Sequence, residues 1–297
     1  MTREDVTFRS GQNGCAAWLY RPSPGDGPVP CVVMGHGFSL TRHDGLEPYA
    51  QALVAAGAAV LVFDHRHLGD SGGTPRQRFR VAGQTADYRA AVDYARTLEG
   101  VDPDRIVLWG FSFSGGIAAQ VAASDARIAG LLLLCPFLDG LARVRSTSPR
   151  AIAWILPRAL RDMAGGHTLI PVTAQPGEHG AMTLPGEADG FTASIAAGSP
   201  WRNEISAGIF ATVAMHRPVT VAPKVRCPVW IGLGERDVSV SAPAIERFSE
   251  RAPRAELRRY DVDHFEPLYG DGPERIADDQ AAWLRRTVVG DGAPATV

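Results

Sequence analysis

Two hydrophobic patterns alternate along most of the chain. Short, mostly apolar runs lie at residues 31–34, 58–63, 106–109, 128–134, 228–233 and 255–260, and we predict that they are strands. Helix-length amphipathic segments lie between them, at about 45–56, 84–99, 113–124, 241–250 and 273–289. Buried strands that alternate with helices are typical of a mostly parallel sheet with helices on both faces. The chain is therefore predicted to have an α/β fold.

Three local features refine this pattern. Segments 6–9 and 15–20 alternate polar and apolar residues, which predicts an antiparallel hairpin before the parallel sheet. Asp44 with Glu47 resembles a capping box at the first helix. Pro273 suits the first turn of the last helix.

The stretch from residue 137 to 222 interrupts the alternation, and it is too long for a loop without structure of its own. Apolar residues recur there at helical spacing, and Ser199-Pro200 marks a helix start; the spaced residues are Ile152, Ile155, Leu156, Ile205, Ile209, Phe210 and Val213. These helices either extend the packing only or cover the edge of the sheet where open α/β folds bind ligands. We favour the second interpretation, which gives a core of residues 1–136 and 223–297 and a helical cap, or lid, inserted at 137–222.

Composition narrows the range of partners. Of the 297 residues 45% are hydrophobic and 21% charged, and the net charge of −2 offers no attraction for nucleic acid or an anionic membrane. The N-terminus lacks the apolar stretch of a signal peptide, and no apolar run approaches the roughly 18 residues of a membrane span. We expect a cytoplasmic monomer or homodimer with no nucleic-acid or membrane partner. The four widely spaced cysteines are expected to be buried free thiols: Cys15, Cys31, Cys135 and Cys227.

The sharpest chemical signal is the run IVLWGFSFSGG at residues 106–116, where a strand leads through a tight turn into a helix. A serine at such a turn exposes its hydroxyl, and small neighbours are needed because strand and helix approach closely. Gly110 lies two residues before Ser112, which we predict to be a nucleophile. Ser114 stands where the G-x-S-x-G motif has its second glycine. Two alternatives remain: Ser114 is the nucleophile in a shifted frame, or both serines only cap the helix.

A serine nucleophile needs a base, and the base needs an acid that fixes its orientation. His264 follows the last predicted strand, and Asp237 follows the strand before it. The order serine, aspartate, histidine, each after a strand, is one of the known triad orders. Glu235 and Asp139 also follow strands and are alternative acids.

The first parallel strand ends in Gly35-His36-Gly37-Phe38. We predict that the backbone N–H groups of Phe38 and Phe113 form an oxyanion hole. The His36 side chain is interpreted as a support for this loop, because backbone groups perform the chemistry there.

Other motifs are set aside. The run GDSGG at 69–73 is interpreted as a turn, since the alternating pattern excludes an all-β protease. His65-x-His67 has no further ligands at metal-binding spacing, and Gly35-x-Gly37 lacks the third glycine of a dinucleotide fingerprint. We therefore expect no metal and no cofactor.

The segments GHGF (35–38), FDHRHLGDSGG (63–73), GFSFSGG (110–116), GERD (234–237) and VDHFE (262–266) together resemble the α/β-hydrolase superfamily. Within it the chain looks like bacterial esterases similar to dienelactone hydrolases and acyl-peptide or cephalosporin-acetyl esterases. The resemblance implies a metal-free acyl-enzyme mechanism on carboxylic ester, thioester or lactone substrates, with Ser112, Asp237 and His264 as the triad. A serine at the nucleophile position argues against haloalkane dehalogenase, epoxide hydrolase and dienelactone hydrolase activity itself.

The expected partner is a small-molecule acyl substrate. Large apolar residues of the predicted cap either line its pocket or pack ordinarily; they are Trp154, Phe191, Trp201, Phe210 and Met215. Other activities remain open: an amide, peptide or carbon–carbon bond hydrolase on the same triad, a biosynthetic acyltransferase or cyclase, and a ligand-binding relative without catalysis.

Overall fold

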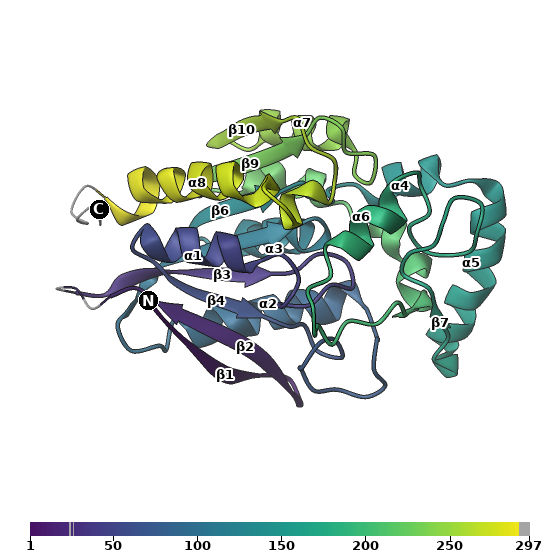
Figure 1. Cartoon of the computed structure of the whole chain (residues 1–297), viewed down its shortest axis with the longest axis horizontal. Helices are drawn as coiled ribbons and strands as arrows, with labels where there is room; N and C mark the ends of the chain where they lie inside the picture. Colours follow the sequence, from purple (N-terminus) through teal and green to yellow (C-terminus); the bar gives the residue numbers. More distant parts are fainter. Residues whose placement is uncertain (24, 26, 291–297) are drawn as a thin grey trace.

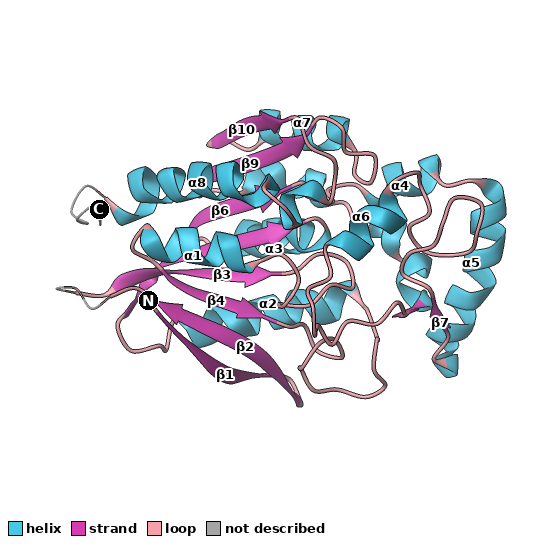
Figure 2. Ribbon diagram, in the orientation of Figure 1, coloured by secondary structure: helices cyan, strands magenta, loops and turns pink. Residues whose placement is uncertain are grey.

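An eight-stranded sheet forms the centre of the computed structural model, which describes residues 1–23, 25 and 27–290 (Figures 1 and 2). The strand order is β1-β2-β4-β3-β5-β6-β9-β10, and only the pairs β1–β2 and β2–β4 are antiparallel. The strands are β1 Thr2–Ser10, β2 Asn13–Arg21, β3 Val29–Gly35, β4 Ala59–Phe63, β5 Val101–Phe111, β6 Ile128–Leu134, β9 Val229–Gly234 and β10 Ala255–Tyr260. The predicted N-terminal hairpin and the mostly parallel sheet are both confirmed.

Helices cover both faces of this sheet (Figure 1). Helix α1 (Glu47–Ala55) packs against α8 (Gly272–Leu284), and α2 (Val81–Ala95) packs against α3 (Phe113–Ser124) on the opposite face, where α7 (Ala242–Arg251) also lies. Strand β4 is buried along its whole length, as a strand with helices on both sides must be. All four cysteines are buried and free.

The predicted capping box at the first helix is wrong. Helix α1 begins at Glu47 with no side-chain cap. The Asp44 carboxylate instead accepts hydrogen bonds from the backbone N–H of Thr41 (2.9 Å) and of Ala196 (3.2 Å), so it ties two loops together. Pro273 does lie in the first turn of α8, as predicted.

The segment between β6 and β9 has several short elements, which lie together beyond the carboxyl ends of the strands (Figure 1). They are α4 Gly140–Ser146, α5 Pro149–Arg161, a π-helical turn Asp162–Gly166, β7 Leu169–Ile170, α6 Glu187–Ala193, β8 Ile205–Ser206 and the 3₁₀ turns Ala207–Ala211, Val213–Met215 and Pro218–Lys224. The helix expected around residues 152–156 is confirmed. The helix expected over 205–213 is wrong, because β8 pairs with β7 and only 3₁₀ turns follow. No helix begins at Ser199-Pro200.

A partly buried ion pair joins this segment to the start of α2. Arg80, just before α2, donates through Nη2 to Asp162 Oδ2 (2.6 Å) and through Nη1 to the Ser206 hydroxyl (2.7 Å). Asp162 also accepts from the backbone N–H groups of Thr168 (2.9 Å) and Gly208 (2.8 Å). Two distant parts of the segment therefore meet at one partly buried arginine.

The remaining short helical turns are Glu266–Leu268, after β10, and Arg285–Val289, after α8. Across residues 1–23, 25 and 27–290, the helices are too short or too polar for a bilayer crossing.

Candidate active site

Ser112 occupies the sharp turn between β5 and α3. Its backbone has φ 53° and ψ −118°, a region that non-glycine residues rarely adopt. The backbone around it is held firmly: Ser112 N–H donates to the Leu134 carbonyl (3.0 Å), and the Ser112 carbonyl accepts from Phe137 N–H (2.8 Å). The strain is thus enforced by the two strands and the loop that flank the turn.

Gly110 shows why this turn requires small residues. A Cβ atom added there would lie 2.6 Å from the backbone nitrogen of Gly115. No real Cβ contact is that short, so any larger residue would push β5 and α3 apart. The close approach expected from the sequence is confirmed.

His264 and Asp237 reach Ser112 from the far end of the chain. The Ser112 hydroxyl lies 2.9 Å from His264 Nε2, and His264 Nδ1 lies 2.6 Å from Asp237 Oδ2. Since an ionised carboxylate only accepts, Nδ1 donates to Asp237 and Nε2 is left to accept from Ser112. Both the histidine and the aspartate side chain are almost fully buried. The arrangement can remove a proton from the serine hydroxyl and stabilise the imidazolium that results.

Asp237 is itself fixed by the loop that carries it. Its second oxygen, Oδ1, accepts from the backbone N–H groups of Ser239 (2.8 Å) and Val240 (3.1 Å). The carboxylate therefore cannot rotate away from His264 without losing two hydrogen bonds.

The alternative residues lie elsewhere. The buried Ser114 hydroxyl donates to the His36 carbonyl and lies 3.4 Å from His65 Nε2. Asp139 caps α4 and pairs with Arg217 (3.0 Å). Glu235 is exposed to solvent. The geometry thus favours Ser112 and Asp237 over each of them.

Phe38 and Phe113 lie side by side, with ring centroids 5.9 Å apart. Phe113 is the first residue of α3, where backbone N–H groups have no partner within the helix. The loop after β3 leaves no room for a side chain at Gly37, since a Cβ there would lie 2.7 Å from Phe111 Cδ1. The two predicted oxyanion residues are therefore neighbours beside the serine turn.

The His36 ring lies beneath this loop. It is buried, and burial lowers its pKa to about 3, which keeps the ring neutral at physiological pH. Its Nε2 lies 3.4 Å from the His65 backbone N–H, which makes it the acceptor, so Nδ1 donates to the Gly37 carbonyl (3.0 Å). The side chain braces the loop, as interpreted from the sequence.

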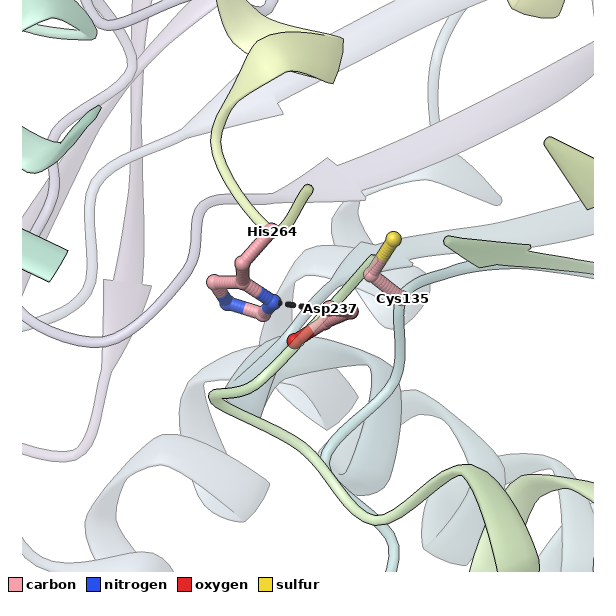
Figure 3. Close-up of side chains that lie close together, drawn as sticks. All are labelled: Cys135, Asp237 and His264. Carbon is pink, nitrogen blue, oxygen red and sulfur yellow. Dashed lines mark hydrogen bonds and ion pairs between the residues drawn. The ribbon is translucent and has the colours of Figure 1, made fainter. Parts of the chain in front are cut away.

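Cys135 also lies near the acid and the base (Figure 3). One potential ligand atom each of Cys135, Asp237 and His264 lies within 4.8 Å of the others. Burial, and next the charge of Asp237, raise the pKa of the Cys135 thiol well above its ordinary value. Asp237 and His264 bind each other, and the second nitrogen of His264 faces the Ser112 hydroxyl, so neither group is free to hold a metal. The three residues do not fit a metal centre.

A mainly apolar cavity of about 290 Å³ adjoins the site. Phe38 and Phe113 form its wall on the core side, while Ile155, Leu156 and Phe210 contribute from the segment between β6 and β9. Phe210 is thus the one predicted pocket residue that lines this cavity.

The other four predicted pocket residues do not line the cavity. Trp154 stacks on His179, with ring centroids 4.6 Å apart, because it points from another face of α5 than Ile155. Phe191 is buried against Trp201 and so serves packing. Met215 is 74% exposed at a surface turn. These assignments to the pocket are corrected accordingly.

The sequence interpretation missed Arg143 and Ser239, which both line the cavity, and Glu187, which contacts both. No local signal marks them. A charged residue in an irregular segment usually faces solvent, and only the contacts of Glu187 with Arg143 and Ser239 reveal their position.

The family of the chain follows from its similarity to known proteins. Residues 27–265 match the family model described as "Serine aminopeptidase, S33" (Hydrolase_4). The chain belongs to this family of α/β-hydrolases. The match spans all parallel strands and the segments that carry Ser112, Asp237 and His264.

Two relatives illustrate the range of names that proteins similar to this α/β-hydrolase carry. The "Quorum-quenching protein AidA" of Acinetobacter baumannii (strain MDR-ZJ06) is 34% identical over 289 residues, which cover 96% of this chain and 95% of the relative. The "Thiohydrolase aneE" of Aspergillus aculeatus (strain ATCC 16872 / CBS 172.66 / WB 5094) is 32% identical over 161 residues, covering 52% of this chain and 50% of that protein. The superfamily inferred from the sequence is confirmed, whereas the esterase branch named there is not established.

Solved structures support the fold. The α/β hydrolase GrgF from Penicillium sp. sh18 superposes with a TM-score of 0.83 at 24% identity, covering 98% of this chain and 100% of that one. Est1E from Butyrivibrio proteoclasticus, bound to ferulic acid, gives a TM-score of 0.68 at 18% identity, with 96% and 100% covered. The predicted α/β-hydrolase fold is confirmed.

Proposed function

We propose that this α/β-hydrolase cleaves a carboxylic ester, thioester or lactone through a serine-bound acyl intermediate. The observation that carries the proposal is the continuous hydrogen-bond chain from the Ser112 hydroxyl through His264 to Asp237, at 2.9 and 2.6 Å. A strained, buried turn that presents a hydroxyl to an imidazole has no evident use in packing alone.

The reaction follows from the geometry. His264 Nε2 takes the Ser112 proton as the hydroxyl oxygen attacks the acyl carbonyl carbon. The amides of Phe38 and Phe113 hold the negative charge that develops on the carbonyl oxygen. His264 then gives the proton to the leaving group, and water, activated by the same ring, releases the acid.

The surroundings favour an acyl group with apolar character. The cavity beside Phe113 is walled by aromatic and aliphatic side chains, including Ile155 and Phe210. Relatives carry names such as quorum-quenching protein and thiohydrolase. The name thiohydrolase fits an enzyme that acts on an activated acyl carbonyl.

Acyl transfer is a second candidate on the same residues. The "Polyketide transferase ATR5" of Stachybotrys chlorohalonatus (strain IBT 40285) is 28% identical over 302 residues, covering 96% of this chain and 98% of that protein. Such an enzyme would pass the acyl group from Ser112 to an acceptor other than water, so the two candidates differ only in the second half of the reaction.

A substrate panel separates these possibilities. We expect the wild-type chain to hydrolyse p-nitrophenyl esters, acyl thioesters and lactones of medium chain length, and to leave p-nitroanilides essentially uncleaved. Ser112→Ala should reduce kcat by at least about 10³-fold, because it removes the nucleophile. Ser124→Ala is the matched control, since Ser124 lies on the same helix away from the site.

The outcomes are distinct. Turnover of anilides in preference to esters would replace the proposal by an amidase. Release of a transferred product instead of the free acid would select the transferase. Full activity of Ser112→Ala, or no binding or turnover of any acyl compound, would contradict the proposed site.

A further inference from the structure

One charged side chain lies in the wall of the otherwise mainly apolar cavity. Arg143, on α4, is the only charged residue among the described residues that line it. Its side chain is 21% exposed, so it is partly buried and partly open to solvent. The donors of a partly buried arginine are normally paired with protein groups or with water.

Here the donors are only partly satisfied. Nη2 of Arg143 lies 3.4 Å from Glu187 Oε1 and 3.5 Å from Oε2, both long for a charge-assisted bond. Nε and Nη1 have no hydrogen-bond acceptor among residues 1–23, 25 and 27–290. Neither atom is fully buried, so both remain accessible. The guanidinium thus offers free donors beside the cavity.

Glu187 is held too firmly to move toward Arg143. Its carboxylate is buried and accepts from the Ser239 hydroxyl (2.8 Å) and from the Leu184 backbone N–H (2.8 Å). Ser239 belongs to the loop that fixes Asp237. The Arg143–Glu187 pair is therefore fixed to the loop that carries Asp237, unlike a pair on the surface.

The charges of Arg143 and Glu187 limit which chemical group the cavity can bind at this point. Glu187 already compensates the Arg143 cation, so a second carboxylate in the cavity would be repelled. A chain of methylene groups alone would displace water from the guanidinium and leave its donors unpaired, which is costly. A neutral oxygen satisfies the donors at no such cost.

We propose that Arg143 recognises a neutral oxygen, such as a keto, hydroxyl or ether oxygen, on the acyl chain of the substrate. This inference rests on the proposed function, because it places the acyl chain of that substrate in the cavity. Arg143 is a specificity residue and takes no part in the bond cleavage at Ser112.

The test uses p-nitrophenyl esters of equal chain length. One member is all methylene, others carry an ether oxygen at successive chain positions, and one ends in a carboxylate. In the wild-type chain we expect kcat/KM for at least one oxygen position to exceed that of the all-methylene ester about tenfold, as a charge-assisted hydrogen bond allows. The carboxylate member should be the poorest substrate.

Variants assign the preference to the pair. In the double variant Arg143→Met with Glu187→Gln, which removes both charges together, the oxygen preference should fall to about onefold. In Glu187→Gln alone the uncompensated Arg143 should now favour the carboxylate member. Arg143→Lys, which keeps the charge, should retain part of the preference and guards against a folding defect of the double variant.

Calorimetric binding of the same esters to Ser112→Ala should give the same ranking without any turnover. If no oxygen position is preferred in turnover or in binding, or if the preference survives the double variant, the inference is overturned. Failure of the proposed function is a different result: no ester would be hydrolysed and no fluorophosphonate would label the protein, while the binding ranking would still report on Arg143.

Discussion

Ser114 illustrates how a departure from a motif acquires a role at the residue scale. The usual glycine at this position would leave a gap between α3 and the loop of His36. Here the Ser114 hydroxyl fills it, donates to the His36 carbonyl and contacts His65. Helix α3 and the loop that carries His36 and Phe38 are therefore joined by a buried hydrogen bond.

Ser114→Ala should lower both stability and turnover. The buried His36 carbonyl loses its donor, which costs about 1–3 kcal/mol in the free energy of unfolding. Because the same loop carries the Phe38 amide, we expect kcat to fall severalfold while KM stays nearly constant. Urea unfolding and ester kinetics measure both effects.

Ser124→Ala provides the comparison, since its hydroxyl also donates to a carbonyl of α3, that of Val121, but at the end of α3 away from the loop of His36 and Phe38. Equal kinetic behaviour of the two variants would disprove the link between Ser114 and the loop.

The sequence predicted some residues of the site and not others for a physical reason. Ser112, Asp237 and His264 each follow a strand of a parallel sheet, and the carboxyl ends of such strands meet at one edge. The residues of the cavity depend on how α4 and α5 rotate about their axes. Trp154 and Ile155 are adjacent in sequence, yet only Ile155 lines the cavity.

At the scale of elements, prediction succeeded where a pattern repeats. Strands β3, β4 and β6 are apolar runs, and their bounds agree with the sequence within a few residues. Strand β5 begins at Val101, five residues earlier than predicted, because Asp102-Pro103-Asp104 has the composition of a turn. Val101 nevertheless pairs with Val29 across a register shift, which only the neighbouring strand determines.

The segment between β6 and β9 was harder to predict because its elements are short. Helices α4 and α6 have seven residues each and are too brief to show a clear periodicity. Strand β8 has two residues, and its pairing with β7 is a tertiary contact. Buried apolar side chains such as Ile155, Phe191 and Ile209 anchor this segment to the core, and the bonds of Arg80 join two of its distant parts.

Arg80→Met should loosen this segment selectively. Asp162 would keep its two backbone donors but lose its cation, at a cost of about 2 kcal/mol. We expect faster amide hydrogen exchange at residues 162–170 and 205–211, with the central strands unchanged. Hydrogen–deuterium exchange with mass spectrometry resolves these regions.

Arg202→Met is the matched control, because Arg202 forms a largely exposed pair with Glu204 in the same segment. An exposed pair contributes little, so this variant should exchange like the wild type. Unchanged protection in Arg80→Met would show that Arg80 does not hold the segment.

At the scale of the whole molecule, buried histidines make stability depend on pH. His216 stacks on Phe113 (ring centroids 4.8 Å apart), and neither of its ring nitrogens has a partner among the described residues. Burial lowers its pKa from 6.5 to about 4. The unfolded chain therefore binds a proton between pH 6.5 and 4 that the folded chain refuses, and stability falls as the pH falls through this window.

His216→Phe should reduce this acid sensitivity. The wild-type chain is expected to lose about 2 kcal/mol through His216 alone between pH 7.5 and pH 5, and the phenylalanine variant should lose that much less. His36 remains in both proteins, so part of the pH dependence persists. Urea unfolding at the two pH values measures the difference, and an identical pH dependence of the two proteins would refute this assignment.

The most direct measurement of the central claim is the site of covalent modification by a fluorophosphonate. We predict one phosphonyl group per chain, found on Ser112 by peptide mass mapping, lost in Ser112→Ala and strongly slowed in His264→Gln. Ser114→Ala should still be labelled. A phosphonyl group on Ser114, or labelling that persists in Ser112→Ala, would contradict the account.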